Sequence, residues 1–161
     1  MRKRTYLIAG LILALCLTGC MTTTRWNSNS WDAFRKDMLE KYSDIRQLKA
    51  EQGPSALRIS CYYGNISDDD MDALKTDLKR FLSSEEFLAE YVAYGHEKAE
   101  KNTSSSGLME YLPDICISLY PNGSTKTTWD SEARYYTVPY RSDRMMEVDN
   151  YQTWSDWDRS E

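Results

Sequence analysis

Few side chains in this sequence have the chemistry of a catalytic site. The 161 residues include four cysteines, Cys16, Cys20, Cys61 and Cys116, and a single histidine, His96. A serine-hydrolase triad needs a histidine between its nucleophile and its carboxylate, and no Gly-x-Ser-x-Gly segment surrounds a serine in this chain. The sequence also contains no glycine-rich phosphate-binding loop. These observations favour a protein without catalytic activity.

Histidine and clustered acids are the residue types from which metal sites are built. The order His96-Glu97-x-x-Glu100 resembles half of a zinc site, but the second histidine is missing. The three aspartates at 68–70 are adjacent, whereas a calcium loop alternates its ligands around a glycine. With Ser67 before them they predict a helix N-terminus of the capping-box type. We therefore predict no metal ion and no cofactor.

The first twenty residues have the parts of a secretory signal. Arg2, Lys3 and Arg4 precede an apolar run over residues 7–17, which is shorter than the roughly 20 residues of a transmembrane helix. An ordinary secretory peptide would end in small residues of the A-x-A kind, but here the run ends in Leu17-Thr18-Gly19-Cys20. This segment resembles the lipobox of bacterial lipoproteins. The resemblance implies cleavage before Cys20 and a diacylglycerol on the Cys20 sulfur.

The resemblance also implies an order of segments along the chain. Residues 1–19 would be the cleaved signal peptide, 20–30 the lipidated cysteine and a flexible tether, and 31–161 a single extracytoplasmic domain. The ten residues at 21–30 are mostly small and polar, and fully extended they reach at most about 35 Å. We therefore expect a domain held close to the cell membrane, or to the outer membrane if the host has two membranes.

The charge of the mature chain restricts its partners. Without the three basic residues of the signal, 17 basic and 25 acidic residues remain, which gives a net charge of −8. Nucleic acid requires a basic surface, so an acidic domain is a poor partner for it. An anionic bilayer surface does not attract such a domain either. The expected contact with the membrane is therefore through the lipid anchor.

Cys61 and Cys116 are the cysteines left to the folded domain, and their pairing is open. An oxidising compartment favours a disulfide between them. In the strand pattern around residue 61 the apolar positions include Cys61, whereas around residue 116 they are the neighbours of Cys116. Side chains alternate across a sheet, so the two thiols fall on opposite faces and cannot be joined without a bulge.

Aromatic residues gather in the last third of the chain. Tyr151, Trp154 and Trp157 stand among short acids and amides. Exposed aromatic rings can stack on sugar rings or receive the side chains of a protein partner, and the neighbouring acids and amides supply hydrogen bonds. The alternative is that this tail lies on the core of its own domain. We retain these three residues as candidate binding residues.

The elements that would position these residues follow from the hydrophobic pattern. A helix is predicted from Ser30 as N-cap to a stop at Gly53-Pro54, because Trp31, Phe34, Met38, Tyr42, Ile45 and Leu48 recur at three- and four-residue spacing. A strand at 56–63 is followed by a helix after Ser67, and a new helix begins after Ser83 or Ser84.

The second half of the chain changes to a strand pattern. Strands are predicted at 114–120, 125–129 and 135–140, with a turn at 121–124. The order helix, strand, two helices and β meander predicts an α+β domain with helices packed on one face of a mainly antiparallel sheet. The partner and direction of the strand at 56–63 stay open.

We therefore expect a lipid-anchored, non-catalytic interaction or ligand-binding domain at the bacterial cell envelope, with an envelope protein or a glycan as its partner. Two alternatives remain. One is an enzyme or enzyme accessory acting on cell-wall polymer, which would need paired carboxylates in an aromatic-lined cleft. The other is a structural envelope protein. The sequence gives no indication of oligomeric state.

Overall fold

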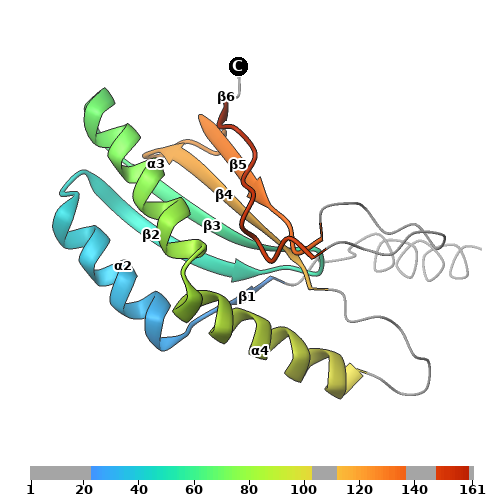
Figure 1. Cartoon of the computed structure of the whole chain (residues 1–161). Helices are drawn as coiled ribbons and strands as arrows, with labels where there is room; N and C mark the ends of the chain where they lie inside the picture. Colours follow the sequence, from blue (N-terminus) through green and yellow to red (C-terminus); the bar gives the residue numbers. More distant parts are fainter. Residues whose placement is uncertain (1–22, 103–111, 137–147, 160–161) are drawn as a thin grey trace, which may run out of the picture.

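A computed structural model describes residues 23–102, 112–136 and 148–159. Within them the chain forms three helices, α2 (Asn29–Lys41), α3 (Asp68–Leu82) and α4 (Glu85–Asn102). It also forms six strands, β1 (Thr24–Arg25), β2 (Ile45–Gln52), β3 (Ala56–Tyr63), β4 (Asp114–Pro121), β5 (Trp129–Ala133) and β6 (Asp158–Arg159). The predicted α+β class is confirmed (Figure 1).

The six strands form one mixed sheet in which spatial order follows sequence order. β3 and β4 run parallel in an unbroken register from Ala56 opposite Asp114 to Tyr63 opposite Pro121, and every other neighbouring pair is antiparallel. Two parallel neighbours need a crossover connection, and here α3 and α4 lie within it. The strand at 56–63, whose partner and direction the sequence left open, therefore pairs with β2 in the antiparallel direction and with β4 in the parallel direction.

The predicted helix from Trp31 to Gly53-Pro54 is wrong in its second half. α2 ends at Lys41, and its C-cap Tyr42 has an extended backbone. Ile45 and Leu48 fit a helical stripe, but they lie on β2 and pair with Tyr63 and Cys61 of β3. Tertiary pairing overrides the local pattern here, as it commonly does for short apolar runs.

The strands that follow β4 in the chain also have bounds that differ from the predicted ones. β5 begins at Trp129, so the predicted return strand at 125–129 starts too early. Residues 124–128 form the connection, with Ser124 donating its backbone N–H to Pro121 and Thr128 to Leu119. The predicted strand at 135–140 lies partly outside the described residues, and Tyr136 forms an isolated bridge with Val148.

Residues 24–30, predicted as part of a flexible tether, belong to the folded domain. Thr24 and Arg25 pair with the end of β2. Trp26 is 3% exposed, and its ring makes edge contacts with Phe87 and Tyr91 of α4 at 5.4 and 5.9 Å. Burying an indole offsets the entropy of ordering the short segment around it.

The N-terminus of α2 is held by hydrogen bonds to the neighbouring helix α4. The N-cap is Ser28 rather than the predicted Ser30, and its hydroxyl accepts a hydrogen bond from the Trp31 N–H at 3.2 Å. Ser30 instead donates its N–H and its hydroxyl to the carboxylate of Glu90 on α4. The negative charge of Glu90 at this position also interacts favourably with the positive end of the α2 helix dipole.

The predicted start of α3 is confirmed. Ser67 is the N-cap and accepts a hydrogen bond from the Asp70 N–H, while its hydroxyl donates to the Asp70 carboxylate at 2.8 Å. α4 begins at Glu85, directly after Ser84, as the second cap predicts. The three aspartates therefore serve the helix terminus, and the described residues contain no acidic, cysteine or histidine group fit for a metal ion.

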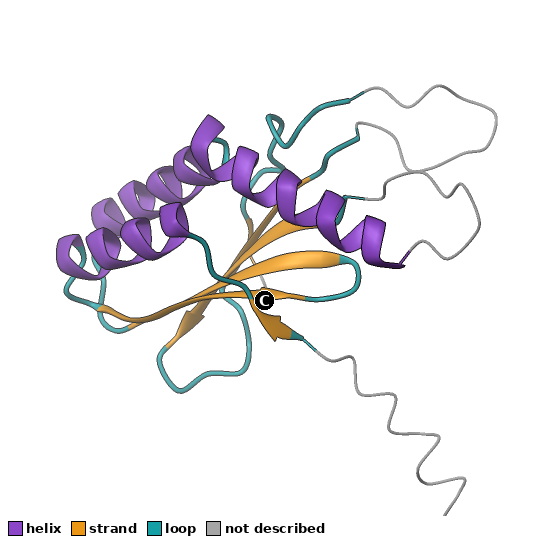
Figure 2. Cartoon of the chain, turned by 90° about the horizontal axis from the view of Figure 1, so that it is seen from below, coloured by secondary structure: helices purple, strands orange, loops and turns teal. Residues whose placement is uncertain are grey.

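The core lies between one face of the sheet and the helices. Six inward residues of β3 and β4 have no exposed surface, and the helices cover them with equally buried side chains: Leu57, Ile59, Cys61, Ile115, Ile117, Leu119, Leu74, Leu78, Leu82 and Phe87. Figure 2 shows the three described helices on the same side of the sheet. The opposite face of the sheet carries no described helix.

One charged cluster joins α2 to α3 inside this layer. The Asp77 side chain is 9% exposed, and its carboxylate accepts hydrogen bonds from Lys41 Nζ at 2.6 Å and from the Tyr42 hydroxyl at 2.8 Å. Arg80 binds the other carboxylate oxygen. Burial of the carboxyl opposes its ionisation, but the hydrogen bonds from Lys41 and Tyr42 outweigh burial and hold the pKa of Asp77 below its usual value.

Replacing this carboxylate should destabilise the domain. We expect Asp77→Asn to lower the free energy of unfolding by about 1–3 kcal/mol, because the hydrogen bonds lose their charged acceptor. A depressed folded pKa means that the stabilisation is present above the ordinary aspartate pKa and is lost as pH falls through the folded value. Urea unfolding at neutral and acidic pH measures both effects.

The exposed Asp37 of α2 provides the matched control. Asp37→Asn should leave the neutral-pH unfolding midpoint nearly unchanged. Equal midpoints for the Asp37 and Asp77 variants would contradict a stabilising role for the cluster.

Candidate functional site

Tyr151, a predicted binding residue, lies in the interior. It has no exposed surface, its ring lies 5.6 Å from the rings of Tyr91 and Tyr135, and its hydroxyl donates to the Pro113 carbonyl at 2.9 Å. A side chain without exposed surface cannot receive a ligand. The prediction for Tyr151 is therefore wrong.

Trp154 and Trp157, the other two predicted binding residues, pack against α3. The Trp154 indole N–H donates to the Ser83 hydroxyl at 2.7 Å. Lys79 Nζ lies 4.9 Å from the Trp157 ring and 5.8 Å from the Trp154 ring, and it donates to the Ser155 carbonyl at 2.8 Å. Cation–π contacts of this kind hold a segment in place. These tryptophans attach the C-terminal segment to its own domain, which is the alternative given above.

The two cysteines of the domain occupy opposite faces of the sheet. Cys61 faces the core opposite Leu119, whereas Cys116 pairs with Arg58 on the other face and is half-buried. Both thiols are free. Burial raises the pKa of Cys61 to about 12 and that of Cys116 to about 11. Neither group has the thiolate character of a nucleophile at neutral pH.

The thiols should be distinguishable by alkylation. We expect iodoacetamide to label Cys116 slowly in the folded domain, at a rate that rises with pH toward about 11, because the thiolate is the reacting form. Cys61 should react only after unfolding, and intact mass should not change on reduction. Cys116→Ser is the control for assignment. A gain of two protons on reduction would overturn the free-thiol state.

The face of the sheet away from the helices is polar. Alternation along β2 to β5 directs a set of mainly polar side chains to this open face, among them Lys49, Glu51, Arg58, Ser60, Tyr62, Cys116, Ser118, Tyr120, Asp130 and Glu132. The two central serines, Ser60 and Ser118, lie opposite each other in the parallel register and are nearly buried beneath their larger neighbours. Cationic, anionic and aromatic groups surround them.

A pair of stacked tyrosines lies on the open face. The rings of Tyr62 and Tyr120 are 4.9 Å apart and nearly parallel, and Lys49 Nζ lies 5.3 Å from the Tyr62 ring. Both tyrosines are half-buried, in contrast to the fully buried Tyr151. Period-two alternation in the sequence predicts that Tyr62 and Tyr120 face outward. Their contact depends on the parallel register of β3 and β4, which the sequence does not show.

A hollow of about 320 Å³ lies beside Ser118, one of the two central serines. It is lined by the guanidinium-bearing Arg58, by the acids Asp130, Glu132 and Asp158, and by the smaller Cys116, Ser118, Ser131 and Ser155. Its volume is within the range of small-molecule sites. Its mixed charge suits a ligand with several hydrogen-bonding groups.

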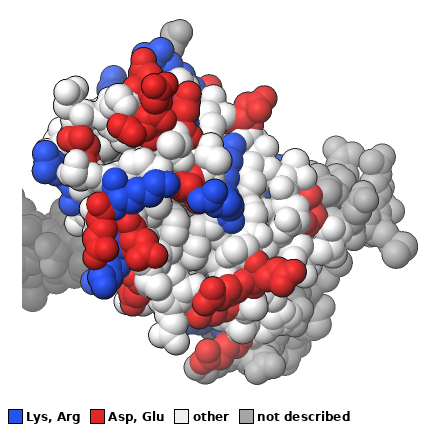
Figure 3. Space-filling view, turned by 60° about the vertical axis from the view of Figure 1, so that its left-hand side comes forward, with Lys and Arg blue, Asp and Glu red and all other residues white. Residues whose placement is uncertain are grey.

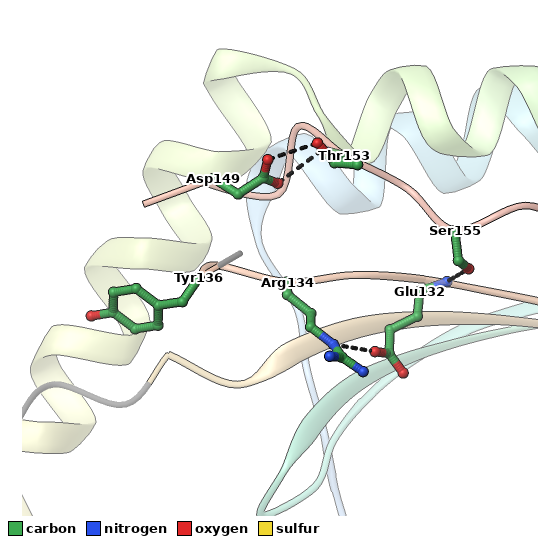
Figure 4. A pocket seen from close by; sticks show the side chains of 6 residues that line it. All are labelled: Glu132, Arg134, Tyr136, Asp149, Thr153 and Ser155. Atoms are coloured by element: carbon green, nitrogen blue, oxygen red, sulfur yellow. Dashed lines mark hydrogen bonds and ion pairs between the residues drawn. The ribbon is translucent and has the colours of Figure 1, made fainter. Parts of the chain in front are cut away.

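A second hollow of about 280 Å³ shares Glu132 and Ser155 with the first (Figure 4). Arg134 Nε donates to the Glu132 carboxylate at 2.6 Å, and the Ser155 hydroxyl accepts from the Glu132 N–H at 2.9 Å. On the other side, the Asp149 carboxylate accepts from the Thr153 N–H and hydroxyl at 2.8 and 2.7 Å. The lining side chains are thus already positioned by their own hydrogen bonds.

Electrostatics in this region couple three charged groups. Burial, together with the negative charge of Glu132, raises the pKa of Asp114 above its usual value. The hydrogen bond from Arg134 to Glu132 raises the pKa of the Arg134 guanidinium. Glu132 is therefore engaged as an ion-pair partner, and Asp114 is the carboxyl whose ionisation is disfavoured.

The comparisons with known proteins give no relative for this arrangement. No protein-family model, curated protein or solved structure matches the chain. In residues 23–102, 112–136 and 148–159, no helix combines the length and hydrophobicity needed to span a bilayer. Function must therefore be argued from the geometry of the open face and from the N-terminal sequence.

Proposed function

We propose that this chain is a lipid-anchored, extracytoplasmic protein of the bacterial cell envelope that binds a ligand or partner without catalysis. The anchoring part of the proposal rests on the charged start, the apolar run and the Leu17-Thr18-Gly19-Cys20 segment. Two or three acyl chains hold a protein firmly, since each buried CH₂ contributes about 0.8 kcal/mol.

The folded domain lies nearer the anchor than the sequence pattern predicts. β1 begins at Thr24, only four residues after Cys20. Fully extended, four residues span at most about 14 Å. In this proposal the domain lies directly against the membrane surface, with little freedom to search for distant partners.

The open face of the sheet is the observation that carries the binding function. We infer that the helices pack on one face only, which leaves the polar face available. The stacked Tyr62–Tyr120 pair and the adjoining hollow combine an aromatic surface with Arg58 and Asp130 as hydrogen-bonding groups. Aromatic rings beside such groups are suited to sugar rings, so a glycan of the envelope is the ligand class we favour over a protein partner.

The catalytic alternative finds only one supporting feature, the raised pKa of Asp114 beside Glu132. Cell-wall hydrolysis would need a free second carboxylate and an aromatic cleft. Glu132 is instead paired with Arg134, and Trp154 lies on α3. The geometry therefore supports binding better than glycoside hydrolysis.

The anchor can be tested by removing the lipidated sulfur. We expect Cys20→Ala to prevent processing, so that the chain retains residues 1–19 and lacks the acyl chains. Cell fractionation with detergent extraction and intact-mass measurement check both expectations. Cys16→Ala is the matched control and should be processed and anchored normally. Unchanged membrane retention and unchanged mass in the Cys20 variant would contradict the proposal.

The open face can be tested by removing its aromatic pair. Binding to isolated cell wall and to glycan panels should weaken about five-fold or more in Tyr62→Ser/Tyr120→Ser, the range for lost aromatic contacts. Trp157→Ala serves as control, because Trp157 packs on α3 away from the open face. It should lower stability while leaving affinity unchanged. Absence of binding by the unsubstituted protein would count against the glycan proposal.

A further inference from the structure

A separate hollow of about 410 Å³ lies on the other side of the molecule, between α2 and β2. Trp31, Arg35 and Leu39 form its helical wall, the consecutive residues 46–51 of β2 form its other wall, and Arg25 lines one end. Six consecutive strand residues can line one hollow only where it follows the strand backbone. Figure 3, which brings the α2 side of the molecule forward, shows Lys and Arg side chains close together near the middle of this side.

Within the part of the chain that the structure describes, the backbone of β2 along this hollow has a short stretch of edge without a neighbouring strand. Among the described residues, β1 pairs with only Glu51 and Gln52 of β2, and the Trp26 N–H adds one bond to the Ala50 carbonyl at 2.9 Å. Backbone groups alternate between the two edges of a strand, so Leu48 presents its N–H and C=O to the same edge as Ala50. A register irregularity between Ile45 and Gln47 ends the regular edge on the other side.

The hollow is cationic in a chain that is acidic overall. Arg25, Arg35 and Arg46 are its basic lining residues, while the side chains of Lys49 and Glu51 alternate to the open face; the whole chain, in contrast, has a net charge of −5. The Nε of Arg35 is buried and has no hydrogen-bond partner among the described residues. Nη2 of the same guanidinium lies 3.6 Å from the Asp32 carboxylate. Leaving a buried donor without an acceptor costs free energy, and an acceptor supplied by a ligand would recover it.

These features select one kind of occupant. A second copy of the chain would bring the same arginines against each other, so self-pairing of this edge is disfavoured. The free edge is also too short for a long added strand. A chain end needs little strand length, and its terminal carboxylate is the acceptor that a guanidinium binds best.

We propose that the hollow between α2 and β2 binds the C-terminal end of an extended polypeptide. Its carboxylate lies at Arg35, and its last residues pair with the backbone of Leu48. Trp31 and Leu39 supply the apolar wall for a side chain near that end. This surface is distinct from the open face, so the inference stands or falls independently of glycan binding.

The test uses random peptides of about six residues, made once with free C-terminal carboxylates and once with C-terminal amides. The full chain should enrich peptides from the carboxylate library only. Arg35→Gln should weaken the enriched peptides about ten-fold or more, as expected for a lost charge-assisted contact. Hydrogen exchange should show protection of the Leu48 amide when peptide is added.

Lys36→Gln is the matched control, because Lys36 follows Arg35 on α2, is 75% exposed and does not line the hollow. It removes the same charge and should leave peptide affinity unchanged. Circular dichroism and the unfolding midpoint establish that the Arg35 variant is folded.

Four outcomes would overturn the proposal. They are equal enrichment of amides and carboxylates, no enrichment at all, Arg35-dependent self-association in sedimentation, and Arg35-dependent binding to phosphatidylglycerol vesicles in place of peptides.

Discussion

β3 and β4 run parallel as neighbours over all eight residues of each strand. Strands so arranged can be joined only by a segment that returns along the sheet. α3 and α4 lie on that segment, and they cover the same face as α2 (Figure 2). The pairing thereby determines that one face of β3 and β4 is largely apolar and buried against the helices while the other is polar. The division of the molecule into a core side and an open polar side depends on this single pair of strands.

α3 connects the remaining parts to that frame through three charged residues of its own. Asp77 binds Lys41 and Tyr42 at the end of α2. Lys75 and Lys79 lie over tryptophans of β5 and the C-terminal segment, with Lys75 Nζ 3.5 Å from the Trp129 ring. Charged groups with little exposed surface are stable only with such partners. The helix is thus an apolar support for the sheet and a polar connector for two distant segments.

Local signals in the sequence were sufficient where a local interaction decides the structure. Ser67 with Asp70 predicted the start of α3, and period-two alternation predicted that Cys61 and Cys116 face opposite sides. Pairing between distant strands left no local signal. Ile45 and Leu48 satisfy the spacing of a helix and of a strand equally well, so β2 and the hollow along its edge were not predictable. Aromatic composition likewise could not distinguish the structural Trp154 from the outward-facing Tyr62.

The position of Trp26 has a mechanical consequence. β1 is two residues long, so it resists tension only weakly by its own hydrogen bonds. Trp26 follows it and is wedged against Phe87, Tyr91 and Tyr94 of α4. A pull on the chain ahead of Thr24 would therefore load the short pairing of β1 first and then this indole, which passes the force into α4. The buried indole therefore resists separation of the N-terminal segment from the domain after the short pairing between β1 and β2 has broken.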